Sequence, residues 1–378
     1  MKKCINILQY GALTTNKGGI ESYIISQLRH IDRKIFKYDF LIAKNSPKVA
    51  YEDEVKSYKC NIYRDYIPWS KSFFGHYYAL YKFFKKNKGK YDIVVTNIVD
   101  FHNINILIVA KLFGVKTCIA HSHMANDLRS NLVKKLFICI NKKLGKYFCD
   151  YLFACSEQAG EWLFGSLWNE KKTLVLKNAI EVKKFTFNFT IRNEIRKLLH
   201  VENNIVIGHT GKFSDQKNHE FLIKVFKEIY DRNNNFRLIL VGEGLLENYI
   251  REKVKEMGIE EAVIFLGMRA DVNNILQGMD IFLFPSKYEG LSVSLIEAQA
   301  SGLKCFVSDT VSNDVKITNL VNFISLEREP DFWANRILES YQYIRKNVFF
   351  DIKNSGYDII TEINKIENFY KNVVTNQK

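Results

Sequence analysis

The sequence contains little proline, with 4 residues in 378, and it has no glycine- and serine-rich stretch of the kind that links domains. It also lacks any apolar run close to the roughly 20 residues that cross a bilayer. Hydrophobic residues make up 47% of the chain and charged residues 25%, which excludes a disordered protein. A chain of this length exceeds what one hydrophobic core usually organises. We therefore expect two domains, whose boundary must be found from the pattern of strands and helices.

Paired cysteines are absent as well. None of the 7 cysteines forms a C-x-x-C pair, and most lie in apolar stretches, where a free thiol behaves as a small hydrophobic side chain. This argues against a structural zinc site and favours a reducing compartment. Asn6 and Gln9 interrupt the first apolar run, which indicates a strand rather than a signal peptide. These features predict a cytoplasmic location.

The net charge of +14 is concentrated in one half of the chain. Residues 1–180 contain 29 Lys and Arg against 14 Asp and Glu, whereas residues 181–378 contain 26 against 27. A one-sided basic field implies an anionic partner, which could be nucleic acid, a membrane surface or a phosphorylated ligand. A soluble basic protein without such a partner would not require this segregation.

Short apolar runs alternate with longer helical patterns along the chain. The strand-like runs are Cys4–Gln9, Tyr38–Ile42, Asp92–Thr96, Lys116–His121, Tyr151–Ala154, Thr173–Leu176, Ile205–His209, Phe236–Val241, Val263–Leu266, Ile281–Pro285 and Lys304–Val307. This alternation predicts an α/β fold with parallel sheets covered by helices on both faces. A charged interval at Lys177–Glu202 separates the two series, and we place the domains at residues 1–182 and 183–350.

The segment Ile281–Gly302 carries the strongest functional signal. After its buried strand, Gly290 leads into a helix whose unpaired N–H groups suit a phosphate. Glu289 lies at the carboxyl end of the strand, and Glu297 lies about two turns along the helix. Their spacing alone shows nothing, because three other glutamate pairs share it. Only this pair follows a buried strand and brackets a glycine-led helix.

The segment Ile207–His219 has the same context, after a strand and before a helix. Gly211 permits close approach of a ligand to the backbone, and Lys212 and Lys217 flank the turn. Fixed ammonium groups beside a departing phosphate lower the barrier as negative charge develops on its oxygens. The alternative is that both lysines are solvated loop charges.

Two weaker signals lie in the first half of the chain. Gly18 and Gly19 follow the first strand and open a helix, but they do not form a G-x-G-x-x-G fingerprint, and a tight turn explains them equally well. His121 ends a strand, where it could donate to a ligand hydroxyl or a phosphate, or bind a metal. The alternative is a core histidine with its hydrogen bonds satisfied.

Together these segments resemble the retaining glycosyltransferases of family 4, which have the GT-B architecture of two Rossmann-like domains facing a central cleft. The resemblance covers most of the chain and is strongest at Ile205–Asp309. It assigns the donor sugar to Glu289 and the ribose to Glu297. Lys212 stands where relatives often have Arg, and Asn-Ala-Ile at 178–180 replaces a more usual Asn-Gly-Ile. The residues assigned to the donor are Gly18, Gly19, Gly211, Lys212, Lys217, Met268, Arg269, Glu289, Gly290, Leu291, Ser292 and Glu297, and those assigned to catalysis are His121, Glu289, Lys212 and Lys217.

The resemblance implies transfer of a hexose or N-acetylhexosamine from a nucleotide-diphosphate sugar, with UDP as the expected nucleotide. The segments at 216–219 and 308–312 look most like the subgroup that makes bacterial capsular polysaccharide and exopolysaccharide, so the expected acceptor is a growing, polyprenyl-diphosphate-linked glycan. It also implies retention of the anomeric configuration without a protein nucleophile, and a last helix at 351–378 that returns to the first domain.

No cofactor and no metal ion are expected. No two aspartates are separated by a single residue, so an Asp-x-Asp metal clamp is absent from the sequence. The leaving diphosphate would then be stabilised by protein charges, and Lys212 and Lys217 fit that need.

The basic half suggests a membrane surface as a further partner. An apolar stripe at 132–147 is flanked by lysines, and residues 66–91 interleave aromatic side chains with lysines. Our hypothesis is that this surface docks on anionic lipid at the inner face of the cell membrane, near the lipid-linked acceptor. The alternative is an ordinary core-facing helix with a solvated lysine face.

Two other functions remain open at this stage. The first is a nucleotide-sugar epimerase built on the same two-domain architecture, which would have no sugar acceptor. The second is a basic, non-enzymatic nucleic-acid-binding protein, whose affinity would fall steeply with salt. Since the sequence has no nucleic-acid-binding module and its excess basic charge lies away from Lys212, we expect no nucleic-acid partner.

Overall fold

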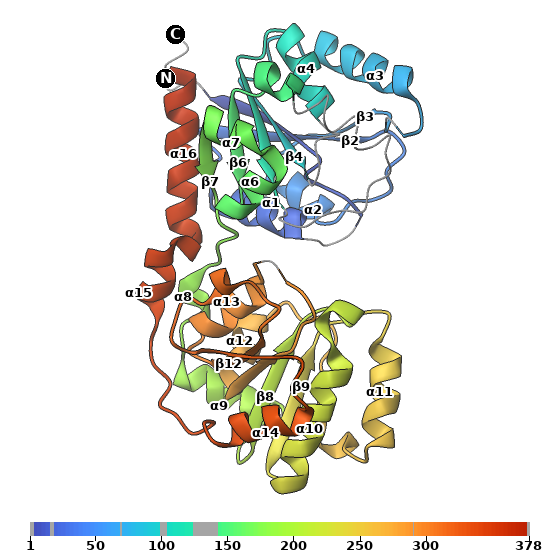
Figure 1. Cartoon of the computed structure of the whole chain (residues 1–378). Helices are drawn as coiled ribbons and strands as arrows, with labels where there is room; N and C mark the ends of the chain where they lie inside the picture. Colours follow the sequence, from blue (N-terminus) through green and yellow to red (C-terminus); the bar gives the residue numbers. More distant parts are fainter. Residues whose placement is uncertain are drawn as a thin grey trace. The chain divides into compact units, whose positions relative to one another are not determined.

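The computed structural model describes residues 4–15, 19–68, 70–98, 104–123, 143–289 and 291–375. The chain forms two compact units: Met1–Ala179 together with Ile359–Lys378, and Ile180–Asp358 (Figure 1). Ile180 donates its backbone N–H to the carbonyl of Tyr357 at 2.9 Å and forms an isolated parallel bridge with Asp358. The first and last residues of the second unit therefore lie side by side, and residues 351–358 belong to this unit.

The first unit contains a parallel sheet of seven strands in the order β3-β2-β1-β4-β5-β6-β7. These strands are β1 (Ile5–Tyr10), β2 (Phe36–Ala43), β3 (Ile62–Tyr66), β4 (Ile93–Ile98), β5 (Thr117–Ser122), β6 (Tyr151–Ala154) and β7 (Lys172–Val175). Its helices are α1 (Gly19–His30), α2 (Glu52–Ser57), α3 (Phe73–Lys86), α4 (Asn105–Leu112), α6 (Glu157–Phe164), α7 (Ser166–Glu170) and α16 (Ile359–Thr375).

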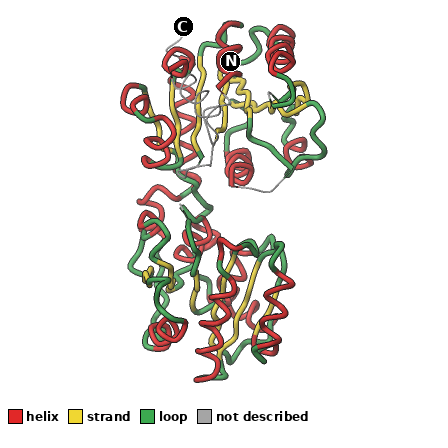
Figure 2. The backbone as a smooth tube through the Cα atoms, turned by 45° about the vertical axis from the view of Figure 1, so that its right-hand side comes forward, coloured by secondary structure: helices red, strands yellow, loops and turns green. Residues whose placement is uncertain are grey.

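Helices cover both faces of this sheet (Figure 2). Alternate residues of β1 point to opposite faces, so Leu8 packs with α3, α4, α6 and α7, while Ile7 packs with α1, α2 and α16. The last helix, α16, joins this core because Phe369 packs edge-on against Tyr151 and Phe153 of β6. The end of the described chain is thereby part of the first unit.

The second unit contains a parallel sheet of six strands in the order β10-β9-β8-β11-β12-β13. These strands are β8 (Ile205–Thr210), β9 (Phe236–Val241), β10 (Val263–Phe265), β11 (Ile281–Phe284), β12 (Lys304–Ser308) and β13 (Val321–Ile324). Its α-helices are α8 (Val182–Phe185), α9 (Phe189–Leu198), α10 (His219–Arg232), α11 (Glu247–Glu256), α12 (Val272–Gly278), α13 (Val293–Ala300), α14 (Pro330–Leu338) and α15 (Phe349–Ile352), followed by a π-helix at Lys353–Tyr357. Single 3₁₀ turns lie at Asp215–Lys217, Glu260–Ala262 and Asn313–Val315.

The faces of the second sheet are also both covered. Leu283 of β11 packs with α10, α11 and α14, and the neighbouring Phe282 packs with α12 and α13 on the opposite face. The strand order reverses between β8 and β11, which lie side by side. In doubly wound sheets, ligands bind beyond the carboxyl ends of strands at such a reversal.

The predicted α/β fold with parallel sheets is confirmed, and two strands were missed. β3 and β13 are edge strands, each paired on one side only. β3 reads Ile-Tyr-Arg-Asp-Tyr and is partly exposed, and β13 has only four residues. Edge strands need not be apolar on both faces, so they lack the continuous hydrophobic run that marks the central strands. Within the described residues, no helix combines the length and apolar character needed to cross a bilayer.

Candidate functional site

The loops that follow β8 and β11 leave the carboxyl edge of the second sheet and are joined by hydrogen bonds. The backbone N–H of Lys287 donates to the carbonyl of Gln216 at 2.8 Å, and the side-chain amide of Asn218 donates to the carbonyl of Pro285 at 3.1 Å. Lys287 also forms an ion pair with Asp215. The two segments that were selected separately in the sequence are therefore adjacent in the fold.

Lys217 and Glu289 are in direct contact. Nζ of Lys217 lies 2.7 Å from Oε1 of Glu289, and the two side chains are only 14% and 11% exposed. The same Nζ lies 4.4 Å from the centre of the Phe284 ring. Gly211 packs against the lysine stem, since a Cβ at this position would lie 3.2 Å from Cε of Lys217. The structure thus brings together three of the residues that the sequence assigned to the donor.

Two buried histidines adjoin Lys217. Nδ1 of His209 donates to the carbonyl of Leu283 at 2.9 Å, which leaves Nε2 as an acceptor with no partner among the described residues. Both ring nitrogens of His219 lack a partner in the same part of the chain. Burial, aided by the charge of Lys217, lowers the pKa of His219 to about 4 and that of His209 well below its usual range. Both rings are neutral at pH 7, so the positive charge here resides on the lysine.

Hydroxyl groups at the same edge are unsatisfied as well. Thr210, the last residue of β8, and Ser286, two residues beyond β11, each bury a side-chain oxygen that has no partner in the described structure. A buried polar group without a hydrogen bond costs about 1–3 kcal/mol, so native structures contain few of them. Their concentration at the carboxyl edge of the second sheet is typical of a site that binds a polar ligand.

Helix α13 begins beyond Glu289. Its N-cap residue, Ser292, is buried, and its hydroxyl lies 2.9 Å from that of Ser294 without capping a backbone N–H. The N–H groups of the first turn are therefore not capped by that side chain. Glu297 lies on α13, and burial raises the pKa of its carboxyl to about 7. Leu291 is half-buried, and Gly290 lies outside the described residues.

The loop after β9 packs against the loop after β8. A Cβ on Gly242, whose φ is +139°, would lie 2.0 Å from the carbonyl oxygen of Gly211, so only glycine allows this approach. The next residue, Glu243, accepts a hydrogen bond from the backbone N–H of Met268 at 3.3 Å. Met268, which the family resemblance assigns to the donor, is therefore linked to the lysine-bearing loop through the loop after β9.

The other two predicted cations, Arg269 and Lys212, differ from each other in their partners. Arg269 is held by Asp271 through two contacts of 2.9 Å. Lys212 is exposed, and no carboxylate of the described residues pairs with it. Lys212 thus remains available to an anion, whereas Lys217 and Arg269 already have counter-ions.

The first unit holds a separate polar cluster at the ends of β4 and β5. His121 is buried, and its Nε2 has no partner among the described residues. Its ring lies 4.0 Å from that of His123, which donates from Nε2 to the side-chain oxygen of Asn97 at 2.9 Å. Burial lowers the pKa of His123 to about 3 and that of His121 well below its usual range. The predicted histidine is therefore a neutral ring with one free nitrogen.

The glycine pair is only partly described. Gly19 is the first residue of α1, is exposed, and has nothing within 4 Å of the position a Cβ would take. Gly18 lies outside the described residues. A different glycine is constrained here: Gly11, with φ +68°, follows β1, and a Cβ on it would lie 2.6 Å from the carbonyl oxygen of Asn97. This contact holds the end of β1 against β4.

Sequence reasoning missed three residues of the second unit. Gln216 contacts Glu289, and His209 and His219 adjoin Lys217. The signal was present, since all three lie within the Ile207–His219 segment already selected. This signal went unused because single neutral side chains give no periodic pattern. The roles of these residues depend on contacts with Glu289 and Leu283, which lie far along the chain.

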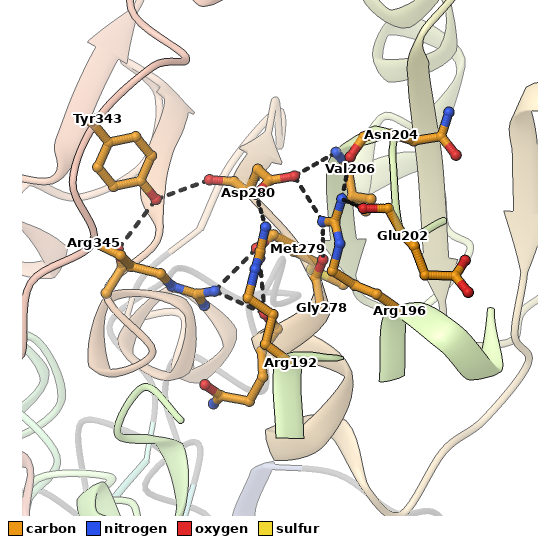
Figure 3. Close-up of polar contacts among 12 residues, drawn as sticks. Arg192, Arg196, Glu202, Asn204, Val206, Gly278, Met279, Asp280, Tyr343 and Arg345 are labelled. Carbon is orange, nitrogen blue, oxygen red and sulfur yellow. Dashed lines mark hydrogen bonds and ion pairs between the residues drawn. The ribbon is translucent and has the colours of Figure 1, made fainter. Parts of the chain in front are cut away.

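A second polar cluster lies at the opposite, amino edge of the same sheet (Figure 3). Arg192, Arg196 and Arg345 donate to the carbonyls at the end of α12, and Asp280 pairs with the first two. The backbone N–H of Val206 also donates to Asp280, at 2.8 Å. A cavity of about 500 Å³ lies beside this cluster. The arginines supply the partners that a helix C-terminus lacks.

The chain is an α/β protein with two doubly wound units, and the Lys217–Glu289 ion pair follows the strands at the switch point of the second. Residues 190–341 match the family model described as glycosyl transferases group 1. A Bacillus subtilis (strain 168) protein named as the glycosyltransferase EpsF is 30% identical over 363 residues, which span 94% of each chain. The chain therefore belongs to the group 1 glycosyl transferases.

Other relatives agree with this family. The UDP-Gal:alpha-D-GlcNAc-diphosphoundecaprenol alpha-1,3-galactosyltransferase of Escherichia coli is 27% identical over 315 residues, 79% of each chain. The capsular polysaccharide biosynthesis glycosyltransferase CapH of Staphylococcus aureus is 25% identical over 371 residues, 94% of this chain and 96% of CapH. The crystal structure of Anabaena HepE in complex with UDP superposes with a TM-score of 0.72 at 16% identity, covering 98% of this chain and 100% of HepE. This likeness confirms the predicted GT-B fold.

Proposed function

We propose that this glycosyltransferase moves a hexose or N-acetylhexosamine from a UDP-sugar to a growing, lipid-linked glycan in the synthesis of capsular polysaccharide or exopolysaccharide. The donor proposal is supported by the Escherichia coli relative, which is named for its UDP-Gal donor, and by the UDP bound to HepE. The acceptor proposal is supported by the diphosphoundecaprenol acceptor of the Escherichia coli relative and by the capsular assignment of CapH.

The contact between Lys217 and Glu289 is the observation that carries this proposal. An ammonium group that can exchange its carboxylate for a diphosphate would stabilise the charge of the leaving group. Lys212, exposed and unpaired among the described residues, would add a second charge to the same oxygens. Glu289 would then be released to accept hydrogen bonds from hydroxyls of the donor sugar.

The remaining donor contacts follow from α13. Its first-turn N–H groups, which Ser292 leaves uncapped, would bind a diphosphate oxygen, and Glu297 would accept hydrogen bonds from the ribose hydroxyls. In the first unit, the free nitrogen of His121 would bind a sugar hydroxyl. We propose retention of the anomeric configuration, without a metal ion or a protein nucleophile, on the family resemblance and on the lysines that could replace the metal.

A direct assay tests this function. The purified chain is incubated with a panel of UDP-hexoses and UDP-N-acetylhexosamines and with a polyprenyl-diphosphate-linked sugar, and both UDP release and the elongated lipid are measured. We expect one donor to give UDP and a longer lipid in equal amounts, with unchanged rate in EDTA and an axial-to-axial outcome by NMR for an α-linked donor. Conversion of one UDP-sugar into its epimer, with no elongated lipid, would show the epimerase instead.

Membrane docking is proposed for the surface formed by helix α3. Residues 66–91 contain six lysines and no acidic residue. The aromatic side chains of Phe74 and Tyr78 are 84% and 59% exposed, and the exposed Lys82 and Lys85 follow on the same helix. Exposed aromatics beside lysines suit the headgroup region of an anionic membrane. Of the apolar stripe at 132–147, residues 132–142 lie outside the described residues.

Vesicle flotation tests the α3 surface. We expect the chain to float with vesicles that contain phosphatidylglycerol and not with phosphatidylcholine alone. Lys82→Glu with Lys85→Glu should reduce binding by more than about thirtyfold, since each lysine near the surface contributes about 1 kcal/mol and each glutamate adds repulsion from the anionic lipid. Lys224→Glu with Lys255→Glu, on exposed helices of the second unit, is the control with the same change of charge. Equal loss in both pairs would assign binding to net charge rather than to this surface.

A further inference from the structure

Glu289 is held by two donors that bind the same oxygen. Its Oε1 accepts from Nζ of Lys217 at 2.7 Å and from the side-chain amide of Gln216 at 3.0 Å. That amide also donates to the carbonyl of Tyr288 at 3.0 Å, which fixes its direction. Among the described residues, no donor binds Oε2 of Glu289. The carboxylate is thus anchored through one oxygen and open at the other.

The backbone of Glu289 is fixed independently of Gln216. Its carbonyl accepts from the N–H of Ser312 at 3.2 Å, and it forms an isolated parallel bridge with Val311. Since the backbone is already held, the bonds from Lys217 and Gln216 decide only where the carboxylate points.

The two donors would behave differently when a diphosphate arrives. A diphosphate carries negative charge, so it would compete with Glu289 for the ammonium of Lys217. A neutral amide is not drawn away in this manner. Gln216 would therefore remain on Oε1 after Lys217 has turned to the phosphate oxygens.

We propose that Gln216 is a positioning residue that keeps the carboxylate of Glu289 in place while Lys217 binds the diphosphate, so that Oε2 meets a hydroxyl of the donor sugar. This inference rests on the proposed function and adds to it a residue that acts through Glu289. It requires Gln216 to matter for the sugar half of the donor and not for the nucleotide half.

The test compares UDP with the UDP-sugar that the wild-type chain uses. In Gln216→Leu, which removes the amide at similar size, we expect the Kd and KM of the UDP-sugar to rise by about tenfold to a hundredfold, the loss typical of a hydrogen bond to a charged group. The Kd of UDP should stay within about twofold. Gln216→Glu, which places a second carboxylate beside Glu289, should show the same split even if the leucine variant folds poorly.

Two comparisons separate positioning from simple loop attachment. Lys287→Met removes the ion pair with Asp215, which joins the same two loops without touching Glu289, and we expect normal UDP-sugar affinity. In a Glu289→Ala background, Gln216→Leu should cause no further loss. Equal effects of Lys287→Met and Gln216→Leu, or a further loss in the Glu289→Ala background, would overturn the inference.

The failure of the proposed function has a different signature. A wild-type chain that binds neither UDP nor any UDP-sugar would overturn the proposed function and this inference with it. A wild-type chain that binds and uses a UDP-sugar, with the Gln216→Leu affinities unchanged, would overturn the inference alone.

Discussion

Both edges of the second sheet carry charged side chains, but the edges differ in whether their polar atoms have hydrogen-bond partners. At the amino edge, the guanidinium groups of Arg192, Arg196 and Arg345 all donate to carbonyls or to Asp280 (Figure 3). At the carboxyl edge, His209, His219, Thr210 and Ser286 each bury a polar atom with no partner among the described residues. We therefore expect unsatisfied hydrogen-bonding capacity, rather than charge alone, to mark the ligand site.

The difference also predicts what each edge contributes to the protein. The arginine cluster closes the end of α12 and takes the place of water there, so its removal should destabilise the fold. Burial lowers the pKa of Arg345 to about 10, which shows how far this cluster is withdrawn from solvent. The carboxyl edge keeps unpaired groups at a cost in stability, which a bound ligand would recover. The predictions below separate these two roles.

The largest effect is expected at Lys217. Lys217→Ala removes a charge that the leaving diphosphate would need, so kcat should fall by roughly 10²–10³. The free energy of unfolding should change little, because the side-chain amide of Gln216 still donates to the carboxylate of Glu289. Steady-state kinetics of UDP release and urea denaturation of the same preparation measure both quantities.

The control for Lys217 is a lysine two turns along the adjoining helix. Lys224→Ala removes an exposed ammonium from α10 that pairs with Glu220 four residues earlier. We expect kcat within about twofold of wild type, since surface ion pairs contribute little and the charge lies off the site. If Lys217→Ala retained wild-type turnover, its assigned role would be wrong.

The next effect concerns stability rather than activity. Arg196 is only 7% exposed and donates to the carbonyls of Gly278 and Asn204 as well as to Asp280. Arg196→Met keeps the apolar stem, removes the donor to the two carbonyls, and removes one of the two arginines that pair with Asp280. We expect a loss of about 2–4 kcal/mol in the free energy of unfolding, with unchanged kcat and KM.

An exposed arginine provides the matching control. Arg336→Met removes a side chain that is 57% exposed and pairs with Glu339. Its free energy of unfolding should stay within about 0.5 kcal/mol of wild type. A loss of activity in Arg196→Met at temperatures where the variant is folded would contradict a purely structural role for the amino edge.

The same two edges show what could be predicted from the sequence. The central strands, and the lysine and glutamate segments that follow two of them, could be predicted because an apolar run that ends in a polar turn is a local signal. The arginine cluster gave no such signal. Nothing in the sequence near Arg192 indicates its role, since its partner Asp280 lies 88 residues away. Long-range polar partners are set by the topology, which the periodicity of a segment does not contain.

The glycines that let the loops after β8 and β9 pack together were also only partly predictable from the sequence. Gly211 was selected because a glycine between a strand and a helix allows close approach, and the structure places Gly242 against it. The sequence around Gly242 does not complete a G-x-G-x-x-G fingerprint, so it gave no signal by itself. The contact between two loops requires the glycine there, and no fingerprint based on one loop could have revealed it.

A smaller effect should follow pH. Burial raises the pKa of Glu297 to about 7, so its carboxyl is mostly protonated at pH 6 and mostly ionised at pH 8. A carboxylate accepts hydrogen bonds from ribose hydroxyls more strongly than a carboxylic acid does. The affinity for the UDP-sugar should therefore improve about fivefold from pH 6 to pH 8. In Glu297→Gln the affinity should be weaker and independent of pH. The probe is a UDP-sugar, because the terminal phosphate of UDP titrates at about pH 6, as phosphate monoesters do, and would add a pH dependence of its own.

The raised pKa of Glu297 also makes the free energy of unfolding depend on pH. Its folded pKa lies above the ordinary value of 4.5, so the folded protein binds this proton more tightly than the unfolded chain does. Its contribution to stability is therefore complete below pH 4.5 and is lost as the pH rises through 7. Urea denaturation should show that the free energy of unfolding falls more from pH 5 to pH 8 in wild type than in Glu297→Gln. An equal fall in both would show that the pKa of Glu297 is not raised.

The smallest effect tests the unsatisfied groups directly. His219 stacks on Phe213 with ring centres 4.2 Å apart, and neither of its nitrogens has a partner among the described residues. His219→Phe keeps the stacking and removes the unpaired nitrogens, so the free energy of unfolding should rise by about 0.5–1 kcal/mol. His76 is the control, because its Nδ1 bonds to the carbonyl of Ile67 at 2.7 Å, and His76→Phe should lower stability by about 1 kcal/mol. A gain at His219 with weaker UDP-sugar binding would show that the carboxyl edge trades stability for a ligand, whereas a loss of stability would show that its nitrogens are satisfied and that the contrast between the two edges does not hold.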